Sequence, residues 1–488
     1  MRRRTRLPPP SCDVLAAVIC ACLSLLLPAL LVPGCVSYTP EPLVPADELA
    51  ALRHTSFADV IAEHAAPGTR TAGVTPAFDL TDGLSEDELI AVALTLNPDL
   101  HARRLEIGAA EALLIGAGVL PNPEVGVSWR TGIGGADGHS LDADLLMDIL
   151  QPWLRSARQA IAMAHFETVQ AEIVAEEWRL VRKTRIALLD VRSAVQIAAM
   201  LDDAVGIRAH MLDLAEKSRA AGEGTDLDVS SAELELAEMQ RDQRFAQADV
   251  DIAGLQLNAV LGLPPDYRLH LTDENTRSTV TVFDALSNDE LEQRLFSGRH
   301  ELRALEAAYQ RSELELELAV QRQFPSLQLG LGLEREAGGD SFLGPAIGLE
   351  FPLFDRNQAE IAEKTVARDR ARAEYVATLH RLRADAYDAR ARLGTARREI
   401  EAQERDVLPK VRRNQDLIEG AFQLGEVGVL DWVTAQQRAL RAQRTYLETL
   451  LRYQRSVIEI EAATGMPLVA PVVLPTRDGT QTRGPGDE

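Results

Sequence analysis

The chain has 488 residues and a formal net charge of −23. A chain this acidic repels phosphate backbones, which argues against a nucleic-acid-binding protein. Aromatic residues contribute only 5% of the sequence and alanine is abundant, so thin helical seams are favoured over a thick globular core.

Residues 1–34 are predicted to be a signal peptide. A basic stretch at Arg2–Arg6 precedes an apolar stretch at Val14–Val32, and Gly34 ends the segment. An uncleaved membrane anchor is the alternative, because the apolar stretch is just long enough to span a bilayer. The mature chain is expected to hold one cysteine, Cys35, and no disulfide, because all the cysteines lie at or before the cleavage point: Cys12, Cys20, Cys22 and Cys35.

Gly34-Cys35 resembles the lipobox of bacterial lipoproteins, in which the cysteine becomes the acylated first residue. Cys35 is therefore the predicted lipidation site, and Val36 after it implies, by the same resemblance, export to the outer membrane. Residues 35–84 lack periodicity and are expected to form an extended arm, with at most a short helix near 46–53.

Residues 85–264 are predicted to form a unit of helices around one β-hairpin. The first helix, 85–119, begins with the acidic run Ser85–Glu88, and Pro98 could kink or restart it. No proline interrupts the next helix, 154–221, which at 1.5 Å per residue is about 100 Å long.

A tight turn separates this long helix from a further helix at 226–261. Gly222 and Gly224 suit the left-handed positions that end a helix. Asp226 or Asp228 can accept hydrogen bonds from the free amides that begin the next helix.

The same pattern recurs about 200 residues later, which indicates a tandem duplication. Gly222-Glu223 is matched by Gly425-Glu426, and the second unit covers 299–466. A polar connector, 265–298, separates the units, and 467–488 is expected to be a disordered tail. The remaining helices are predicted at 289–296, 299–323, 355–424 and 429–464.

The helix lengths predict how these helices pack. In each half the two shorter helices together equal the long one, so they are expected to stack end to end beside it. Pro409 is expected to bend helix 355–424. The coiled-coil seam of this helix is predicted from residues spaced alternately by four and three: Tyr375, Leu379, Leu382, Ala386, Ala389, Leu393, Ala396 and Ile400.

Four segments alternate between apolar and polar residues with the period of a β-strand. They cover residues 124–130, 141–149, 326–333 and 343–351. A half-buried sheet in a soluble sandwich would show the same alternation as strands that span a membrane. Four strands cannot close a transmembrane barrel, and an open edge in lipid is costly, so the hairpins either stay in water or combine with other subunits. Three subunits would supply twelve strands.

The polar face of these strands is expected to line a water-filled lumen if the apolar face meets lipid. Acidic residues outnumber the clear basic residue, Arg130, so the lumen is predicted to prefer cations. The expected lumen residues are Glu124, Asp142, Asp144, Asp148 and Glu350.

No pattern in the sequence indicates catalysis or a bound cofactor. The nine histidines are scattered without a paired-histidine motif, and the mature chain offers no thiolate cluster for a metal. We therefore expect no enzyme, no cofactor and no resident metal site.

Four short motifs occur in a fixed order along the duplicated chain. Their arrangement resembles the TolC family of outer-membrane factors over residues 85–466. These motifs are Leu96-Asn97-Pro98-Asp99-Leu100, Leu120-Pro121-Asn122-Pro123-Glu124, Phe351-Pro352-Leu353-Phe354-Asp355-Arg356-Asn357-Gln358 and Gly425-Glu426-Val427-Gly428-Val429-Leu430-Asp431. The second and third look most like the branch that serves cation-exporting pumps.

The resemblance implies a mainly α fold with a small β part, in which a trimeric α-barrel of long coiled-coil helices is continued by a 12-stranded transmembrane β-barrel. It implies a homotrimer in outer-membrane lipid with a large periplasmic part. A periplasmic adaptor protein and an inner-membrane RND-type transporter would be its partners, and small molecules or metal cations its cargo. A type I secretion duct is the related alternative, and a lipid-anchored periplasmic coiled-coil scaffold is the rival from another class.

By the same resemblance the two helix reversals lie at the periplasmic tip. Helix capping alone remains an alternative role for their acidic residues. The expected adaptor contacts are Gly222, Leu227, Asp228, Gly425, Leu430 and Asp431. The expected acids around the entrance are Glu223, Asp226 and Glu426.

Overall fold

The computed structural model describes residues 38–54, 83–120, 122–131, 139–148, 151–222, 224–272, 287–336, 339–424 and 426–465. The chain divides into two units, residues 1–55 and residues 56–488. In the first unit, α2 (Pro45–His54) confirms the short helix expected near 46–53. The signal peptide, Cys35 and the C-terminal tail lie outside the described residues.

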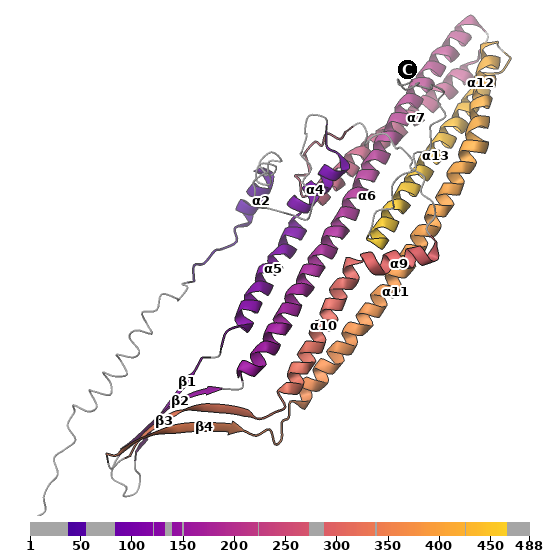
Figure 1. The fold of residues 1–488 in the computed structure, drawn as a ribbon. Helices are drawn as coiled ribbons and strands as arrows, with labels where there is room; N and C mark the ends of the chain where they lie inside the picture. The colour runs from indigo at the N-terminus through magenta and orange to yellow at the C-terminus, as the bar shows by residue number, and fades with distance from the viewer. Residues whose placement is uncertain are drawn as a thin grey trace, which may run out of the picture. The chain divides into compact units, whose positions relative to one another are not determined.

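In the second unit, the helices of the first half begin and end close to their predicted positions (Figure 1). The predicted helix 85–119 is two helices, because Asn97 leaves the helical conformation and caps the segment that starts at Pro98. Ser85 and Glu88 form the capping box that begins the first of them. The four helices are α4 (Glu86–Leu96), α5 (Pro98–Ala117), α6 (Gln151–Ala221) and α7 (Asp226–Leu261).

The second half repeats this order with one irregular turn. Its helices are α9 (Asn288–Gly298), α10 (His300–Gln321), α11 (Gln358–Ala402), α12 (Leu408–Gln423) and α13 (Val429–Thr464). A π-helical turn, η1 (Gln403–Val407), joins α11 to α12 just before Pro409. Proline cannot donate a backbone hydrogen bond, and the wider turn lets Leu408 donate to the carbonyl of Gln403 instead. The irregularity expected at Pro409 therefore begins six residues before it.

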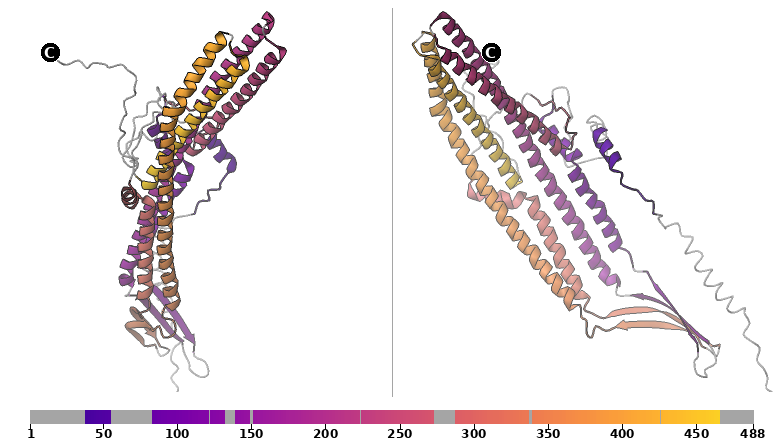
Figure 2. Two further views of the ribbon diagram at one scale, coloured as in Figure 1. Left: turned by 90° about the vertical axis from the view of Figure 1, so that its right-hand side faces the viewer. Right: turned by 180° about the vertical axis from the view of Figure 1, so that it is seen from behind.

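The end-to-end stacking expected from the helix lengths is confirmed. α5 and α7 both pack along α6, while α10 and α13 both pack along α11, and α6 also contacts α10 and α13 (Figure 2). The four rows of helices thus lie in the order α5 with α7, α6, α10 with α13, and α11 with α12.

A glycine closes each joint between stacked helices. Gly262 ends α7 at φ +78°, and Gly465 ends α13 at φ +65°. In the first joint, Asn97 donates a 2.9 Å hydrogen bond from Nδ2 to the Val260 carbonyl while its Oδ1 accepts from the Leu100 amide. The end of one helix is therefore hydrogen-bonded to the start of the other.

The two largest clusters of buried residues form seams, one per half. The first joins α4, α5, α6 and α7 around Leu89, Leu100, Leu188 and Leu257. The second joins α9, α10, α11 and α13, with Tyr453 and Ile460 fully buried. The predicted coiled-coil seam of α11 is confirmed, because its residues from Leu382 to Ile400 are buried and Tyr375 and Leu379 pack against them.

The four predicted strands form one antiparallel sheet at one end of the helices (Figure 1). Their order in the sheet is the order in the chain: β1 (Glu124–Thr131), β2 (His139–Asp148), β3 (Ser326–Arg335) and β4 (Ser341–Glu350). The pairing of β2 with β3 joins the hairpins of the two halves.

Replacing Gly262 with Ala should destabilise the first joint. A Cβ atom there would collide with the Leu96 carbonyl oxygen, and the positive φ alone disfavours a side chain by about 1–3 kcal/mol. Gly206→Ala is the matched control, because Gly206 lies in α6 with nothing within 4 Å of an added Cβ, and alanine is favoured there by about 1 kcal/mol. Thermal unfolding of the purified protein should show a lower melting temperature for the first variant and no loss for the control. Equal melting temperatures would contradict the described joint.

Candidate functional site: the sheet faces and the helix reversals

The register of the sheet gathers its apolar side chains on one face. Val125 pairs with Leu145, Leu145 with Leu331, and Leu331 with Pro345. Because strand side chains alternate between faces, every second residue from these positions shares that face. The apolar residues of this face are Val125, Val127, Trp129, Leu141, Ala143, Leu145, Met147, Leu327, Leu329, Leu331, Leu333, Leu343, Pro345, Ile347 and Leu349. Four residues at the turn end of the strands complete it: Thr131, His139, Arg335 and Ser341.

Within one chain this apolar face is largely uncovered. Val125 is 71% exposed, Leu343 is 74% exposed and Ile347 is 68% exposed. A continuous apolar surface of this kind marks contact with lipid or with another protein. The apolar residues of the four alternating segments therefore share a single face of the folded sheet.

The opposite face carries the acidic residues that the sequence predicts to line the lumen. Asp144 pairs with Gly126, and Asp142 with Ser128, whose hydroxyl donates a 2.9 Å hydrogen bond to it. Arg130 also donates to Asp142 through Nε at 3.0 Å, which offsets one of the negative charges. By the same parity Glu124, Asp148 and Glu350 belong to this face; the side chain of Asp148 is not among those described.

Glu334 is an acidic residue of the same face that the sequence reasoning missed. The register places it directly opposite Asp142 on the neighbouring strand. The alternation of β3 extends to Arg335, beyond the range that the apolar leucines indicate. Following the period one residue further would have identified Glu334.

Glycines on the polar face let the strands approach one another closely. A Cβ at Gly330 would collide with the Leu145 carbonyl oxygen, and a Cβ at Gly126 would lie 2.5 Å from the Asp144 carboxylate. Small residues on one face allow a sheet to curl toward that face. The polar face is therefore the side toward which the sheet can curve.

The sheet does not close on itself. β1 and β4 are its first and last strands, so each pairs on one side only within the chain. The backbone groups along both edges are available for a further strand.

The first helix reversal has a defined cap that includes one of the two predicted aspartates. Gly222 adopts φ +81°, and the N-cap of α7 is Thr225, which exchanges hydrogen bonds with Asp228 in a capping box. These hydrogen bonds from Thr225 hold the pKa of Asp228 below its usual value. The expectation that Asp226 or Asp228 accepts a hydrogen bond from a free amide at the start of the helix is confirmed for Asp228, whose carboxylate accepts from the Thr225 amide at 2.9 Å. Asp226 instead pairs with Arg219 at 3.2 Å.

The second reversal lacks this arrangement. The N-cap of α13 is Gly428, which has no side chain to accept a hydrogen bond, and Asp431 lies exposed in the first turn. Glu426 is exposed and its amide donates to the Ala421 carbonyl. Of the other predicted tip residues, Leu227 is 74% exposed. Glu223, Gly425 and the side chain of Leu430 are outside the described part.

A polar cluster near the reversals was also missed by the sequence reasoning. Arg208 of α6 is only 3% exposed, and its nearest carboxylate, that of Glu235 in α7, lies 3.7 Å away. Gln437 of α13 donates to both carboxylate oxygens of Glu235 at 2.8 Å. The cluster links helices of both halves, and no local pattern in the sequence could show residues so far apart to be neighbours.

Two further properties concern the described residues as a whole. Among them, no group of three or more His, Cys, Asp and Glu side chains is placed to hold a metal ion. None of the helices seen in the structure is both long and apolar enough to cross a membrane.

Residues 291–466 match the family model described as Outer membrane efflux protein. The cobalt-zinc-cadmium resistance protein CzcC of Cupriavidus metallidurans is 24% identical over 393 residues, which cover 78% of this chain and 90% of that protein. The predicted resemblance to outer-membrane efflux proteins is confirmed.

Solved structures of outer-membrane efflux channels share the fold. The OprN channel superposes with a TM-score of 0.66 at 18% identity, over 82% of this chain and 97% of that one. CusC superposes with a TM-score of 0.65 at 19% identity, over 81% and 96%. The predicted fold class, mainly helical with a small antiparallel sheet, is that of these channels.

Nitroxide labels at two adjacent positions would test the two faces of the sheet. Val127 and Ser128 point to opposite faces, so in reconstituted vesicles a label at Val127→Cys should collide with oxygen dissolved in lipid, whereas one at Ser128→Cys should collide with a water-soluble nickel chelate. In the predicted mature chain the sulfur of Cys35 is bonded to lipid, so the introduced cysteine is the single free thiol of each variant. Equal exposure of both labels to the chelate would contradict a lipid-facing apolar surface.

Proposed function

We propose that the chain is the outer-membrane channel of a tripartite efflux system, a passive trimeric conduit from the periplasm to the outside. The observation that carries this proposal is the sheet, with its uncovered apolar face and its two open edges. In lipid, the unpaired backbone groups of an open strand edge are too costly in free energy, and four strands are too few to close a barrel. Three copies joined edge to edge give twelve strands with no open edge and the apolar face outward.

The helices continue the same conduit on the periplasmic side. The hairpins follow α5 and α10 and lead into α6 and α11, so all four rows of helices start at the sheet. Three copies of this layer form a closed helical barrel, and the two reversals form its far tip. There a periplasmic adaptor contacts the exposed residues of the reversals, Leu227 among them, and an inner-membrane transporter supplies the energy.

Metal cations are the cargo that this proposal favours. The relative from Cupriavidus metallidurans is named for resistance to cobalt, zinc and cadmium. Acidic residues on the polar face of the sheet also enrich cations in a lumen of low ionic strength. The chain itself performs no covalent chemistry and holds no cofactor in this role.

Conductance in a planar bilayer tests the conduit and its ion preference together. Under a salt gradient at about 0.01 M, where the Debye length is about 30 Å, the reversal potential should show cation preference. About 1 M salt should largely abolish it, and changing Asp142, Asp144 and Asp148 to Asn should move the reversal potential toward zero. Asp289→Asn, in α9 and away from the sheet, is the control and should leave the preference unchanged. Absence of conductance would contradict the channel, and anion preference would contradict the acidic lumen.

Zinc accumulation in cells tests the tripartite role. Cells that lack the protein should retain more zinc, and the wild-type chain should restore its export. Leu227→Arg places a charge on an exposed apolar residue at the tip and should prevent restoration without loss of cross-linked trimers. Gln256→Arg adds the same charge at an exposed position near the other end of α7 and should restore export. Normal export by the Leu227 variant would contradict a contact at the tip.

A further inference from the structure

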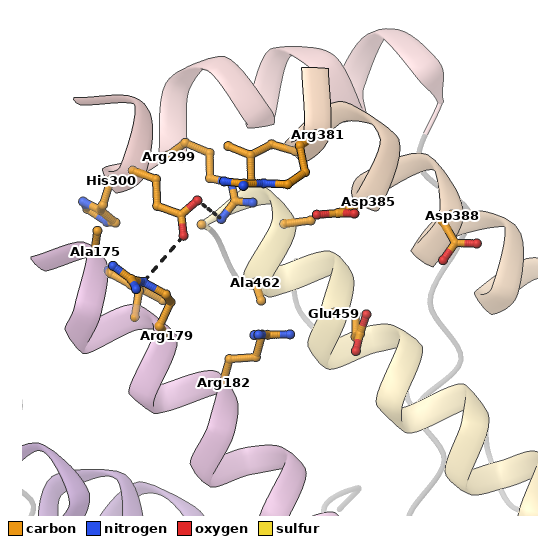
Figure 3. Close-up of a pocket in the computed structure, with 15 residues that line it drawn as sticks. Ala175, Arg179, Arg182, Arg299, His300, Arg381, Asp385, Asp388, Glu459 and Ala462 are labelled. Atoms are coloured by element: carbon orange, nitrogen blue, oxygen red, sulfur yellow. Dashed lines mark ion pairs between the residues drawn. The ribbon is translucent and has the colours of Figure 1, made fainter. Parts of the chain in front are cut away.

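The joint between α13 and α10 leaves a cavity of about 400 Å³. Its lining comes from four helices: α6, the start of α10, α11 and the end of α13 (Figure 3). Four arginines line it, from three different helices: Arg179, Arg182, Arg299 and Arg381. Trp178 stacks on His300 at its wall, with ring centroids 5.5 Å apart.

The corresponding joint in the first half has no such lining. There Asn97 caps α5 with its side chain and is hydrogen-bonded to α7. In the second joint the N-cap of α10 is Arg299, which makes no side-chain hydrogen bond to the first turn. The amides of that turn therefore lack a side-chain acceptor, and the positive end of a 22-residue helix is directed to the joint.

The guanidinium groups of the cavity are incompletely paired. The Nε atom of Arg299 is buried without a hydrogen-bond partner. Among the described residues, no carboxylate lies within 4 Å of Arg182 or Arg381. Burial lowers the pKa of Arg299, attraction to Glu301 and Asp385 raises it, and repulsion from Arg182 and Arg381 lowers it again, so carboxylates and arginines both lie close to Arg299.

The carboxylates that line the cavity are as numerous as its arginines, but only Glu301 among them lies within 4 Å of one of these arginines. Glu301 lies 3.7 Å from Arg179 and 3.9 Å from Arg299, beyond hydrogen-bond distance of both. Asp388 forms its 2.8 Å ion pair with Arg392 instead. Asp385 and Glu459 also line the cavity, but no ion pair within 4 Å ties either to an arginine in the described part of the chain.

We propose that this cavity is a binding site for a phosphate-bearing anion. The forked donors of arginine match the oxygen geometry of phosphate, and here they approach one cavity from three helices. The unpaired amides of α10 add donors of the same polarity. A phosphate bound there would join α6, α10 and α11 at the point where α13 ends. Either a free phosphate or a lipid headgroup has the required chemistry.

Calorimetric titration of the purified full-length protein in detergent tests the site. Inorganic phosphate should bind saturably in a buffer whose ionic strength is held constant with chloride. Loss of one charge-assisted contact should weaken binding about tenfold, so Arg299→Gln and Arg381→Gln should each raise the dissociation constant by that factor. Arg370→Gln is the matched control, because Arg370 lies on α11, is exposed and pairs only with Glu374.

A second titration, with short-chain phosphatidic acid, distinguishes the sources. Saturation by inorganic phosphate assigns a free anion, and saturation by the phosphatidic acid alone assigns a lipid headgroup. Quenching of Trp178 fluorescence, absent in a Trp178→Phe variant, should follow the same isotherm. Should neither ligand saturate, or should the Arg370 variant lose as much affinity as the other two, the proposal is overturned. Variants that migrate as trimers and melt like the wild type remain valid tests.

Discussion

The requirement that every backbone group of a membrane-inserted sheet be hydrogen-bonded determines how this chain can function. The described part of the chain provides four strands, and among them β1 and β4 each keep one open edge. In water such a sheet would expose its apolar face, and in lipid it would expose unpaired amides and carbonyls. Closure with other copies in lipid removes both costs, because the edges pair with one another and the lipid covers the apolar face. Assembly is thus part of the proposed function, since the pore exists only between subunits.

The helical layer continues from the sheet, and its helices pack in rows of matching length. Each half covers one long helix with two shorter ones, and a glycine in the left-handed conformation allows their ends to meet at each joint. Gly262 and Gly465 both approach a neighbouring backbone more closely than any Cβ would permit. The two joints nevertheless differ in chemistry, because Asn97 satisfies the first whereas arginines surround the second.

Charge is distributed unevenly along the proposed conduit. The polar face of the sheet carries aspartates and glutamates with Arg130 as a partial counterweight. At the second joint, Arg182 and Arg381 have no carboxylate within 4 Å among the described residues. An overall charge of −23 describes neither region. Ion preference measured across the whole pore would therefore reflect the narrowest acidic region, whereas anion binding at the joint would reflect local geometry.

The sequence by itself determined the elements and their faces. Helices 226–261 and 429–464 were predicted to the residue, because glycine and capping signals are local. Strand alternation likewise predicted the two faces of the sheet, since its period is a property of the backbone. Only the tertiary structure brought Arg208 to Glu235 and Gln437, and Arg299 to Arg182 and Arg381, since these contacts join helices far apart in the chain. It also identified Thr225, not an aspartate, as the cap of α7, because several neighbouring polar residues could cap and the path of the turn selects among them.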